Sequence, residues 1–281
     1  MKQTKKFAVL GYNTINIGDD IQSYVASTIV KPSYIVMRDD YEKVYDFETG
    51  QRVELQEDIH LIMNGWFMHG IEGEGENVSF KMNDVKFPYA NENIKPIFIS
   101  TCLSKDCPEL FEDDSIDYIK QHSPVLCRDK TTLNLLQEKG VDAEFCGCLT
   151  TSLDVKDVPD NETYEKEFSG KTLLVHGDDL FRLNQHMIAG SVISNQYRHD
   201  IKTFNPRERI DAAGDLLSKY KYVSKIYTTR LHCFLPARAM GIDVEFVTAD
   251  GKDCYRTKDL INKKFTKGEV KNKLFQMGKH L

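Results

Sequence analysis

The sequence predicts an α/β fold made of two α/β domains that face each other across a cleft. Short continuous apolar runs alternate with amphipathic segments along the 281 residues, which is typical of parallel sheets covered by helices on both faces. Hydrophobic residues make up 41% of the chain and charged residues 28%, as in a folded globular protein. At roughly 150 residues per domain, this length favours two domains.

The first half of the chain is predicted to be a series of strands separated by helices. Each strand is a short apolar run ended by polar or turn-forming residues. The last helix of this half stops before Gly140, which suits a helix C-terminus. A polar stretch at Glu48-Thr49-Gly50 predicts a hairpin within 41–55. The predicted strands are 6–12, 34–37, 59–64, 96–101, 124–127 and 143–146, and the predicted helices are 19–30, 109–121 and 129–139.

A change of composition marks the boundary between the halves. Residues 151–170 are polar and acidic and contain no apolar run, as expected of a linker. We therefore divide the chain into an N-terminal α/β domain, 1–155, and a C-terminal α/β domain, 156–281. In the second domain, strands are predicted at 172–176, 191–195, 225–229 and 244–247, and helices at 206–219 and 233–240, with Pro236 in the first turn of the latter.

The charge balance excludes some classes of partner. Lys and Arg number 37 against 43 Asp and Glu, a formal net charge of −6, whereas proteins that bind nucleic acid normally carry a basic footprint. The longest uncharged stretch, 183–197, contains Asn, Gln and His and is shorter than the ~20 apolar residues of a membrane span. The apolar run near the start is also shorter than the roughly 7–15 residues of a signal peptide, so we expect a cytoplasmic protein.

The cysteines are predicted to be free thiols. There are seven, an odd number, and most lie in apolar stretches, which favours reduced, buried side chains. The pairs Cys102/Cys107 and Cys146/Cys148 lack the repeated C-x₂-C spacing of a zinc site. No metal site is expected.

Functional residues are expected just after the strands, because ligands of open α/β sheets bind outside the carboxyl ends of the strands. The first such segment, 11–20, contains Asn16, Gly18 and Asp19. Asp19 is predicted as the N-cap of the following helix. The segment lacks the lysine and the glycine spacing of a phosphate loop, and its two aspartates suit hydroxyl ligands better than a polyanion. The alternative is a helix cap with no further role.

Two arginines also follow predicted strands. Arg128 comes after the strand 124–127, and its planar guanidinium can bind a carboxylate or phosphate through two hydrogen bonds; a surface ion pair is the alternative. Arg230-Leu231-His232 comes after the strand 225–229. A cation, an imidazole and the amides of a helix N-terminus at one strand end suit an anion whose chemistry needs a proton shuttle. A histidine buried in the core is the alternative.

The single tryptophan marks a further candidate. Trp66 lies close to Gly65 and Gly70, and its aromatic face suits a sugar ring. Packing of Trp66 against a turn is an equal alternative.

Three segments together resemble a known family. They are GYNTINIGDDIQ at 11–22, CRDKTTLNLLQEKGVDAEFCG at 127–147 and TTRLHCFLPARAMGIDVEFV at 228–247. In order and content they resemble the polysaccharide pyruvyl transferases, enzymes that move pyruvate from phosphoenolpyruvate onto sugar hydroxyls. The resemblance implies a fold similar to the GT-B architecture, with two Rossmann-like domains and a last helix that returns to the first domain.

The resemblance also implies which residues act. The donor, phosphoenolpyruvate, would be bound by Arg128, Arg230, Leu231 and His232. His232 would act as general acid or base, and Asp19 would deprotonate or orient the acceptor hydroxyl. The acceptor, a sugar or a lipid-linked glycan, would lie on the N-terminal domain near Asn16, Gly18, Asp19 and Trp66. No cofactor is implied. Where relatives carry a glycine-rich loop, this chain has Asn64-Gly65-Trp66.

Two other functions stay open at this point. One is a GT-B glycosyltransferase that uses a nucleotide sugar, which would need groups for the ribose and the base. The other is a non-catalytic sugar-binding relative.

The end of the chain is basic. Residues 256–281 hold eight Lys or Arg and two Asp or Glu, interleaved with apolar residues. Such a segment suits peripheral contact with an anionic membrane. The alternative is a closing helix with a solvated basic face.

Overall fold

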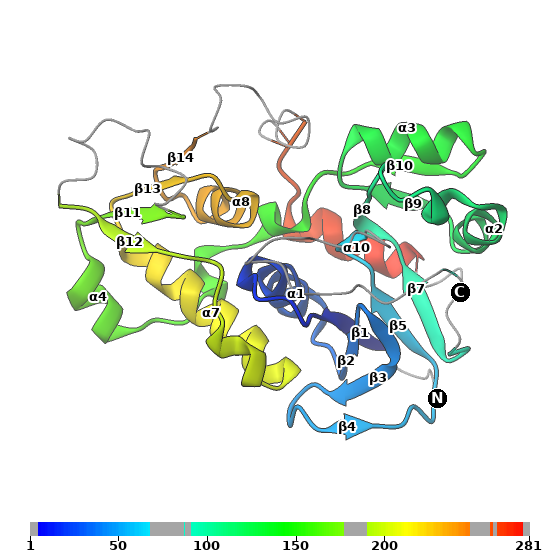
Figure 1. Ribbon diagram of the computed structural model, residues 1–281, viewed down its shortest axis with the longest axis horizontal. Coiled ribbons are helices and arrows are strands. Elements are labelled where there is room, and N and C mark those ends of the chain that lie inside the picture. Colours follow the sequence, from blue (N-terminus) through cyan, green and yellow to red (C-terminus); the bar gives the residue numbers. More distant parts are fainter. Residues whose placement is uncertain are drawn as a thin grey trace.

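The computed structural model has a mixed α/β fold with parallel sheets, as the sequence predicts (Figure 1). It describes residues 5–67, 87, 91–176, 190–247, 259–260 and 263–277. Within these ranges there are seven α-helices and three sheets. No helix in this part of the chain combines the length and apolar character needed to cross a bilayer.

The first sheet has six strands in the order β4-β3-β2-β1-β5-β7. The four strands β2, β1, β5 and β7 are parallel, while β3 and β4 form the antiparallel hairpin predicted within 41–55. Asp46 accepts hydrogen bonds from the backbone N–H groups of Glu48 and Thr49, and Gly50 adopts φ +66°, which completes the turn. The strands are β1 (Lys6–Gly11), β2 (Tyr34–Met37), β3 (Asp40–Asp46), β4 (Arg52–Val53), β5 (Ile59–Ile62) and β7 (Ile94–Ile97).

The second sheet is parallel, in the order β10-β9-β8-β6. The prediction of one strand at 96–101 is wrong, because the chain leaves β7 at Ile97 and enters β8 at Ile99. The chain thus passes from the first sheet to the second at Phe98, and a register shift within β8 follows beside Ser100, whose φ is +56°. The elements are β6 (Trp66–Phe67), β8 (Ile99–Leu103), α2 (Asp113–Gln121), β9 (Val125–Cys127), α3 (Lys130–Glu138) and β10 (Ala143–Phe145).

The third sheet is also parallel, in the order β12-β11-β13-β14, and all four strands were predicted. Helix α8 starts at Leu231, because the carbonyl of Arg230 already accepts from the N–H groups of Cys233 and Phe234. Pro236 therefore lies in the second turn, not the first. The elements are α4 (Glu162–Phe168), β11 (Thr172–Val175), β12 (Val192–Ser194), α7 (Pro206–Tyr222), β13 (Lys225–Thr228), α8 (Leu231–Ala239) and β14 (Val244–Phe246).

The segment expected to be a linker, 151–170, packs against the helices around it. It holds part of the 3₁₀ helix η2 (Leu149–Ser152), the 3₁₀ helix η3 (Val155–Asp157) and α4. The Tyr24 hydroxyl donates to the Asp157 carbonyl at 2.7 Å. Leu153, Val158 and Phe168 are buried in the core. The segment is polar overall, yet these apolar side chains anchor it.

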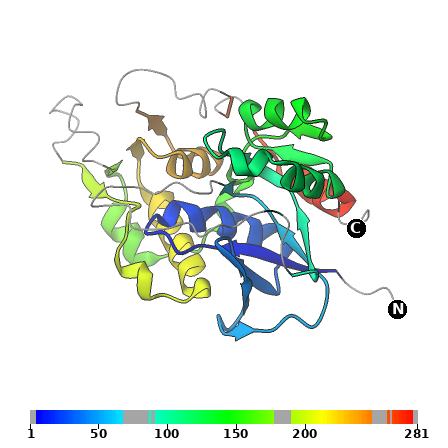
Figure 2. The same ribbon diagram turned by 45° about the vertical axis from the view of Figure 1, so that its right-hand side comes forward.

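Helix α1 (Ile17–Val30) lies at the centre of the molecule, between the first sheet and helices α7 and α8 (Figures 1 and 2). A single apolar cluster contains Val25 of α1, Val9 of β1 and Leu217 of α7. Helix α10 (Lys267–Met277) adds Leu274 to this cluster and returns to the first half of the chain. Phe275 contacts Phe7 edge to face, with ring centroids 6.0 Å apart, and Lys273 pairs with Glu144 at 2.9 Å.

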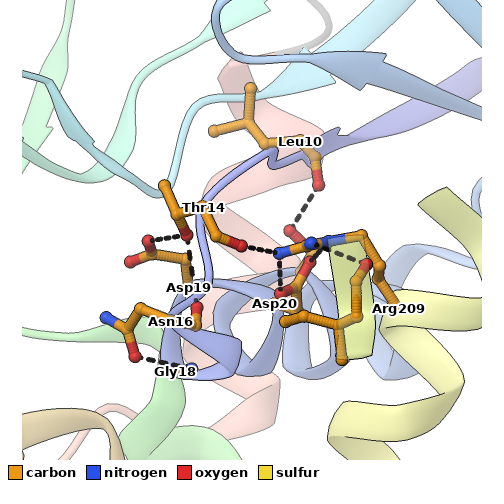
Figure 3. Close-up of polar contacts among 9 residues, drawn as sticks. Leu10, Thr14, Asn16, Gly18, Asp19, Asp20 and Arg209 are labelled. Atoms are coloured by element: carbon orange, nitrogen blue, oxygen red, sulfur yellow. Dashed lines mark hydrogen bonds and ion pairs between the residues drawn. The ribbon is translucent and has the colours of Figure 1, made fainter. Parts of the chain in front are cut away.

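A buried ion pair connects α1 to α7. Arg209 donates to both carboxylate oxygens of Asp20, at 3.1 and 2.8 Å, and also to the carbonyls of Thr14 and Ile201 (Figure 3). Both side chains are at most 3% exposed. Burial acts to raise the pKa of Asp20, while the positive charge and the hydrogen bonds of Arg209 act to lower it. Asp20 therefore depends on Arg209 for its negative charge.

Loss of this ion pair should destabilise the fold strongly. We expect Asp20→Ala to lower the free energy of unfolding by ~3–5 kcal/mol, because it leaves the Arg209 guanidinium buried without its counter-ion. The matched control is Asp211→Ala, which breaks an exposed ion pair between Asp211 and Arg207 on helix α7. This change should cost less than about 1 kcal/mol. Urea denaturation measures both. Equal losses would contradict the role given to the buried pair.

Candidate functional site

The loop between β1 and α1 forms one side of the site. Asn16, and not Asp19, is the N-cap of α1: its backbone is extended, and its side-chain oxygen accepts from the Gly18 N–H at 3.1 Å (Figure 3). The prediction for Asp19 fails because the helix begins at Ile17, which places Asp19 inside the first turn. There the Asp19 carboxylate accepts from the Thr14 hydroxyl at 2.9 Å.

This loop is joined to the end of strand β12 by backbone hydrogen bonds. The N–H of Ile17 donates to the carbonyl of Gln196 at 2.9 Å, and the N–H of Arg198 donates to the carbonyl of Ile15 at 2.8 Å. Asn16 and Tyr197 form an antiparallel bridge between them. Strand ends of the first and third sheets therefore meet at the start of α1.

At Gly18, helix α1 packs tightly against Gln196 and His232. A Cβ atom at Gly18 would lie 2.9 Å from Asn16 Oδ1, 3.0 Å from Gln196 Oε1 and 3.3 Å from the Cβ of His232. These distances are shorter than ordinary van der Waals contacts, so a larger residue here would displace the neighbouring side chains. The structure thereby places Gly18, predicted for the acceptor, beside His232, predicted for the donor.

Arg230 lies between strand β13 and helix α8. Its backbone N–H donates to Thr228 Oγ1 at 3.0 Å. Its guanidinium donates from Nη1 to the Tyr197 hydroxyl at 3.1 Å and places Nη2 3.0 Å from His176 Nδ1. The same guanidinium lies over the Tyr197 ring, 4.6 Å from its centroid. A cation is thus oriented beside the positive end of the α8 dipole, an arrangement that favours anions.

The other two members of the Arg230 segment differ in role. Leu231 is the first residue of α8, and its side chain packs on a small apolar cluster that includes Phe234 and Leu260. Its backbone N–H belongs to the first helical turn, where amides lack intrahelical partners. His232 is half-buried and faces Gly18.

Arg128 follows strand β9 and is only 2% exposed, so the alternative of a surface ion pair is wrong. Its Nη1 donates to Gln22 Oε1 at 3.3 Å. Gln22 is four residues after Gly18 on α1, and residues at this spacing share a helix face. One face of α1 therefore runs from His232 to Arg128. The adjacent Asp129 caps α3 by accepting from the Thr132 N–H.

The family model of the polysaccharide pyruvyl transferases matches residues 16–244. The chain belongs to this family. The matched region begins at the N-cap Asn16 and includes Arg128, Arg230 and His232. No curated protein and no solved structure matches the chain.

Trp66, predicted for the acceptor, comes four residues after strand β5 of the first sheet and lies at the edge of the second sheet. It begins the edge strand β6, is half-buried, and accepts at its carbonyl from Arg38 Nη1 at 3.0 Å. Arg38 in turn lies over the Tyr12 ring, 4.7 Å from its centroid. None of these contacts reaches Asn16 or His232. His69, in the same sequence segment, lies outside the described residues.

Six of the seven cysteines lie in the described ranges, and all six are buried free thiols, as predicted; Cys254 lies outside these ranges. Burial raises the pKa of Cys102 to about 11 and that of Cys233 to about 12. These two thiols therefore stay protonated near neutral pH and are poor nucleophiles.

The sequence reasoning missed two residues whose side chains contact Arg230. His176 directly follows strand β11, and Tyr197 comes three residues after β12. Both obey the rule that functional residues follow strands, so that rule applied to every strand would have found them. Their side chains come into contact because their strands are neighbours in the third sheet, and no local sequence motif predicts this contact.

Alanine at Gly18 should disturb the junction. We expect Gly18→Ala to lower the free energy of unfolding by about 1–3 kcal/mol, as overpacking does in a tight core. The matched control is Gly268→Ala in α10, where a Cβ would have no atom within 4 Å, and stability should not fall. Urea denaturation compares the two. A Gly18→Ala protein as stable as the control would show that the loop moves away freely.

Proposed function

We propose that the protein transfers the pyruvyl group of phosphoenolpyruvate to two hydroxyls of a sugar in a polysaccharide or glycan precursor, forming a ketal. Membership of the polysaccharide pyruvyl transferase family supports this. One observation carries the proposal: the start of α1, with Asn16 and Asp19, abuts the start of α8, with Arg230 and His232. Groups suited to hydroxyls and groups suited to an anion thus lie side by side.

The donor carries a carboxylate and a phosphate on one carbon skeleton. The planar fork of Arg230 matches either group through two parallel hydrogen bonds. The N–H of Leu231 at the positive end of α8 offers a further donor. Arg128, which donates to Gln22 one turn after Gly18 on α1, supplies the second cation. In this proposal the arginines offset the donor's charge, and no metal ion or cofactor takes part.

The reaction needs one proton added to the methylene carbon of the donor and two protons removed from the acceptor hydroxyls. His232 protonates the methylene carbon of the enol, which makes the adjacent carbon cation-like, and an acceptor hydroxyl attacks that carbon and loses its proton. A second hydroxyl then displaces phosphate, which carries away the remaining proton. Asp19, oriented by Thr14, accepts the proton of the attacking hydroxyl. Positioned proton transfer of this kind contributes ~10²–10⁴-fold in rate.

In this proposal the two domains of the GT-B-like arrangement inferred from the sequence bind different substrates. Residues 1–155 would carry the acceptor on Asn16, Gly18 and Asp19, with the face of Trp66 further out. Residues 156–281 would carry most of the donor site, while Arg128 reaches it from the first domain.

The basic C-terminal helix is a separate part of the proposal. Leu260, Phe265 and Leu274 are buried in the protein, which supports the alternative of a closing helix. Peripheral contact with an anionic membrane, if made by α10, would use lysines and Phe275, which is 40% exposed.

Calorimetric titration of the purified protein with phosphoenolpyruvate and with UDP-glucose tests the proposal. We expect saturable binding of phosphoenolpyruvate and none of the nucleotide sugar. Binding of UDP-glucose alone would favour a glycosyltransferase. Binding of neither ligand would favour a non-catalytic sugar-binding protein.

Replacing Arg230 by lysine keeps the charge but removes the fork. We expect Arg230→Lys to weaken phosphoenolpyruvate binding by roughly 10- to 150-fold, equivalent to the ~1.5–3 kcal/mol of a hydrogen bond to a charged group. The control is Arg238→Lys on the exposed face of the same helix, α8, which should bind normally. Titration calorimetry measures both, and circular dichroism confirms folding. Normal affinity in Arg230→Lys would assign Arg230 a structural role.

Replacing His232 separates chemistry from binding. We expect His232→Ala to lower kcat by ~10²–10⁴-fold while donor affinity falls much less. His199→Ala, at an exposed position, serves as the control and should behave as wild type. Phosphate release in the presence of acceptor reports kcat. Loss of affinity with unchanged kcat would make His232 a phosphate ligand and not a proton shuttle.

A further inference from the structure

We propose that His176 and Tyr197 are positioning residues that orient the Arg230 guanidinium toward the anionic groups of the donor. The inference rests on the proposed function, because it concerns how the donor-binding arginine is held. It adds two residues that the pyruvyl transferase sequence motifs do not point to.

The three residues come together through the topology of the third sheet. Its strand order begins β12-β11-β13, and Tyr197, His176 and Arg230 follow these three strands respectively. All three strands are parallel, so their carboxyl ends lie at one edge of the sheet. Parallel pairing thus fixes three backbone positions before any side-chain contact is made.

Tyr197 holds one side of the guanidinium in two ways. Its hydroxyl accepts from Arg230 Nη1 at 3.1 Å, and its ring lies under the guanidinium carbon at 4.6 Å. Tyr197 is itself fixed by its backbone bridge to Asn16. The arginine is therefore coupled to the loop that we assign to the acceptor.

His176 holds the other side. It is 5% exposed, its Nε2 accepts from the backbone N–H of Gln196 at 3.2 Å, and its Nδ1 lies 3.0 Å from Arg230 Nη2. The ring also contacts Tyr197 edge to face, with centroids 4.7 Å apart. A guanidinium and a backbone amide are both donors only, whereas a neutral imidazole has one acceptor nitrogen. The ring therefore accepts at Nε2 from the Gln196 N–H, and its contact with Arg230 Nη2 is one of packing.

The backbone of His176 supports a specific role for this position. Its φ is +61°, in the left-handed region that few residues other than glycine adopt, although asparagine, aspartate and histidine do so more often than most. Such strain persists where the surrounding structure determines it, and it is concentrated at functional sites.

The test is a double-mutant cycle on phosphoenolpyruvate affinity. Tyr197→Phe removes one oxygen and keeps the ring, and His176→Asn removes the ring while keeping a side chain that tolerates the left-handed backbone. Tyr197→Phe should raise the Kd about three- to tenfold, the effect of one neutral hydrogen bond. His176→Asn should also raise the Kd, because the ring that packs beside Arg230 Nη2 is gone. In the Arg230→Lys background neither should raise it further, because the positioned fork is gone. Tyr227→Phe on β13 is the control and should bind normally.

The outcomes separate this inference from the proposed function. Wild-type protein that fails to bind phosphoenolpyruvate overturns the proposed function itself. Wild-type binding with unchanged affinity in both variants, or losses that add fully to that of Arg230→Lys, overturns only the positioning role. Should His176→Asn fail to fold, the Tyr197→Phe cycle alone decides.

Discussion

The buried ion pair between Asp20 and Arg209 is the constraint on which the rest of the structure depends. Removing two ions from water is costly, and the cost is offset here by two hydrogen bonds between them and by two backbone carbonyls that accept from Arg209. One of these carbonyls belongs to Thr14, so the pair fixes the β1–α1 loop as well as the contact between α1 and α7. The positions of Asn16, Gly18 and Asp19 follow from it.

Three arginines illustrate how the surroundings of a guanidinium decide its use. Arg209 is neutralised by a carboxylate and serves the fold. Arg128 is buried beside the neutral amide of Gln22, and Arg230 is oriented by a hydroxyl and an imidazole. In a chain with a net charge of −6, Arg128 lies beside α1 and Arg230 lies beside Tyr197, which bridges to Asn16; these two arginines are the cations that we propose for the donor.

The sequence predicted much of the fold, because parallel strands read as continuous apolar runs, and all four strands of the third sheet were found. It missed features that depend on contacts between distant segments. Asn16 caps α1 because the Ile17 amide is held by Gln196, far along the chain, whereas local rules favoured Asp19. The chain crosses from the first sheet to the second between Ile97 and Ile99, which no periodicity reveals. Arg230 and His232 were identified from their motif, but His176 and Tyr197 join them only through strand order.

A crystal structure of the protein grown with phosphoenolpyruvate tests the central claim most directly. The account predicts donor oxygens within hydrogen-bond distance of the Arg230 guanidinium and the first amides of α8, with the methylene carbon facing His232 and with Tyr197 and His176 in their present contacts. Phosphoenolpyruvate bound elsewhere, with Arg230 still engaged only by protein groups, would contradict the account.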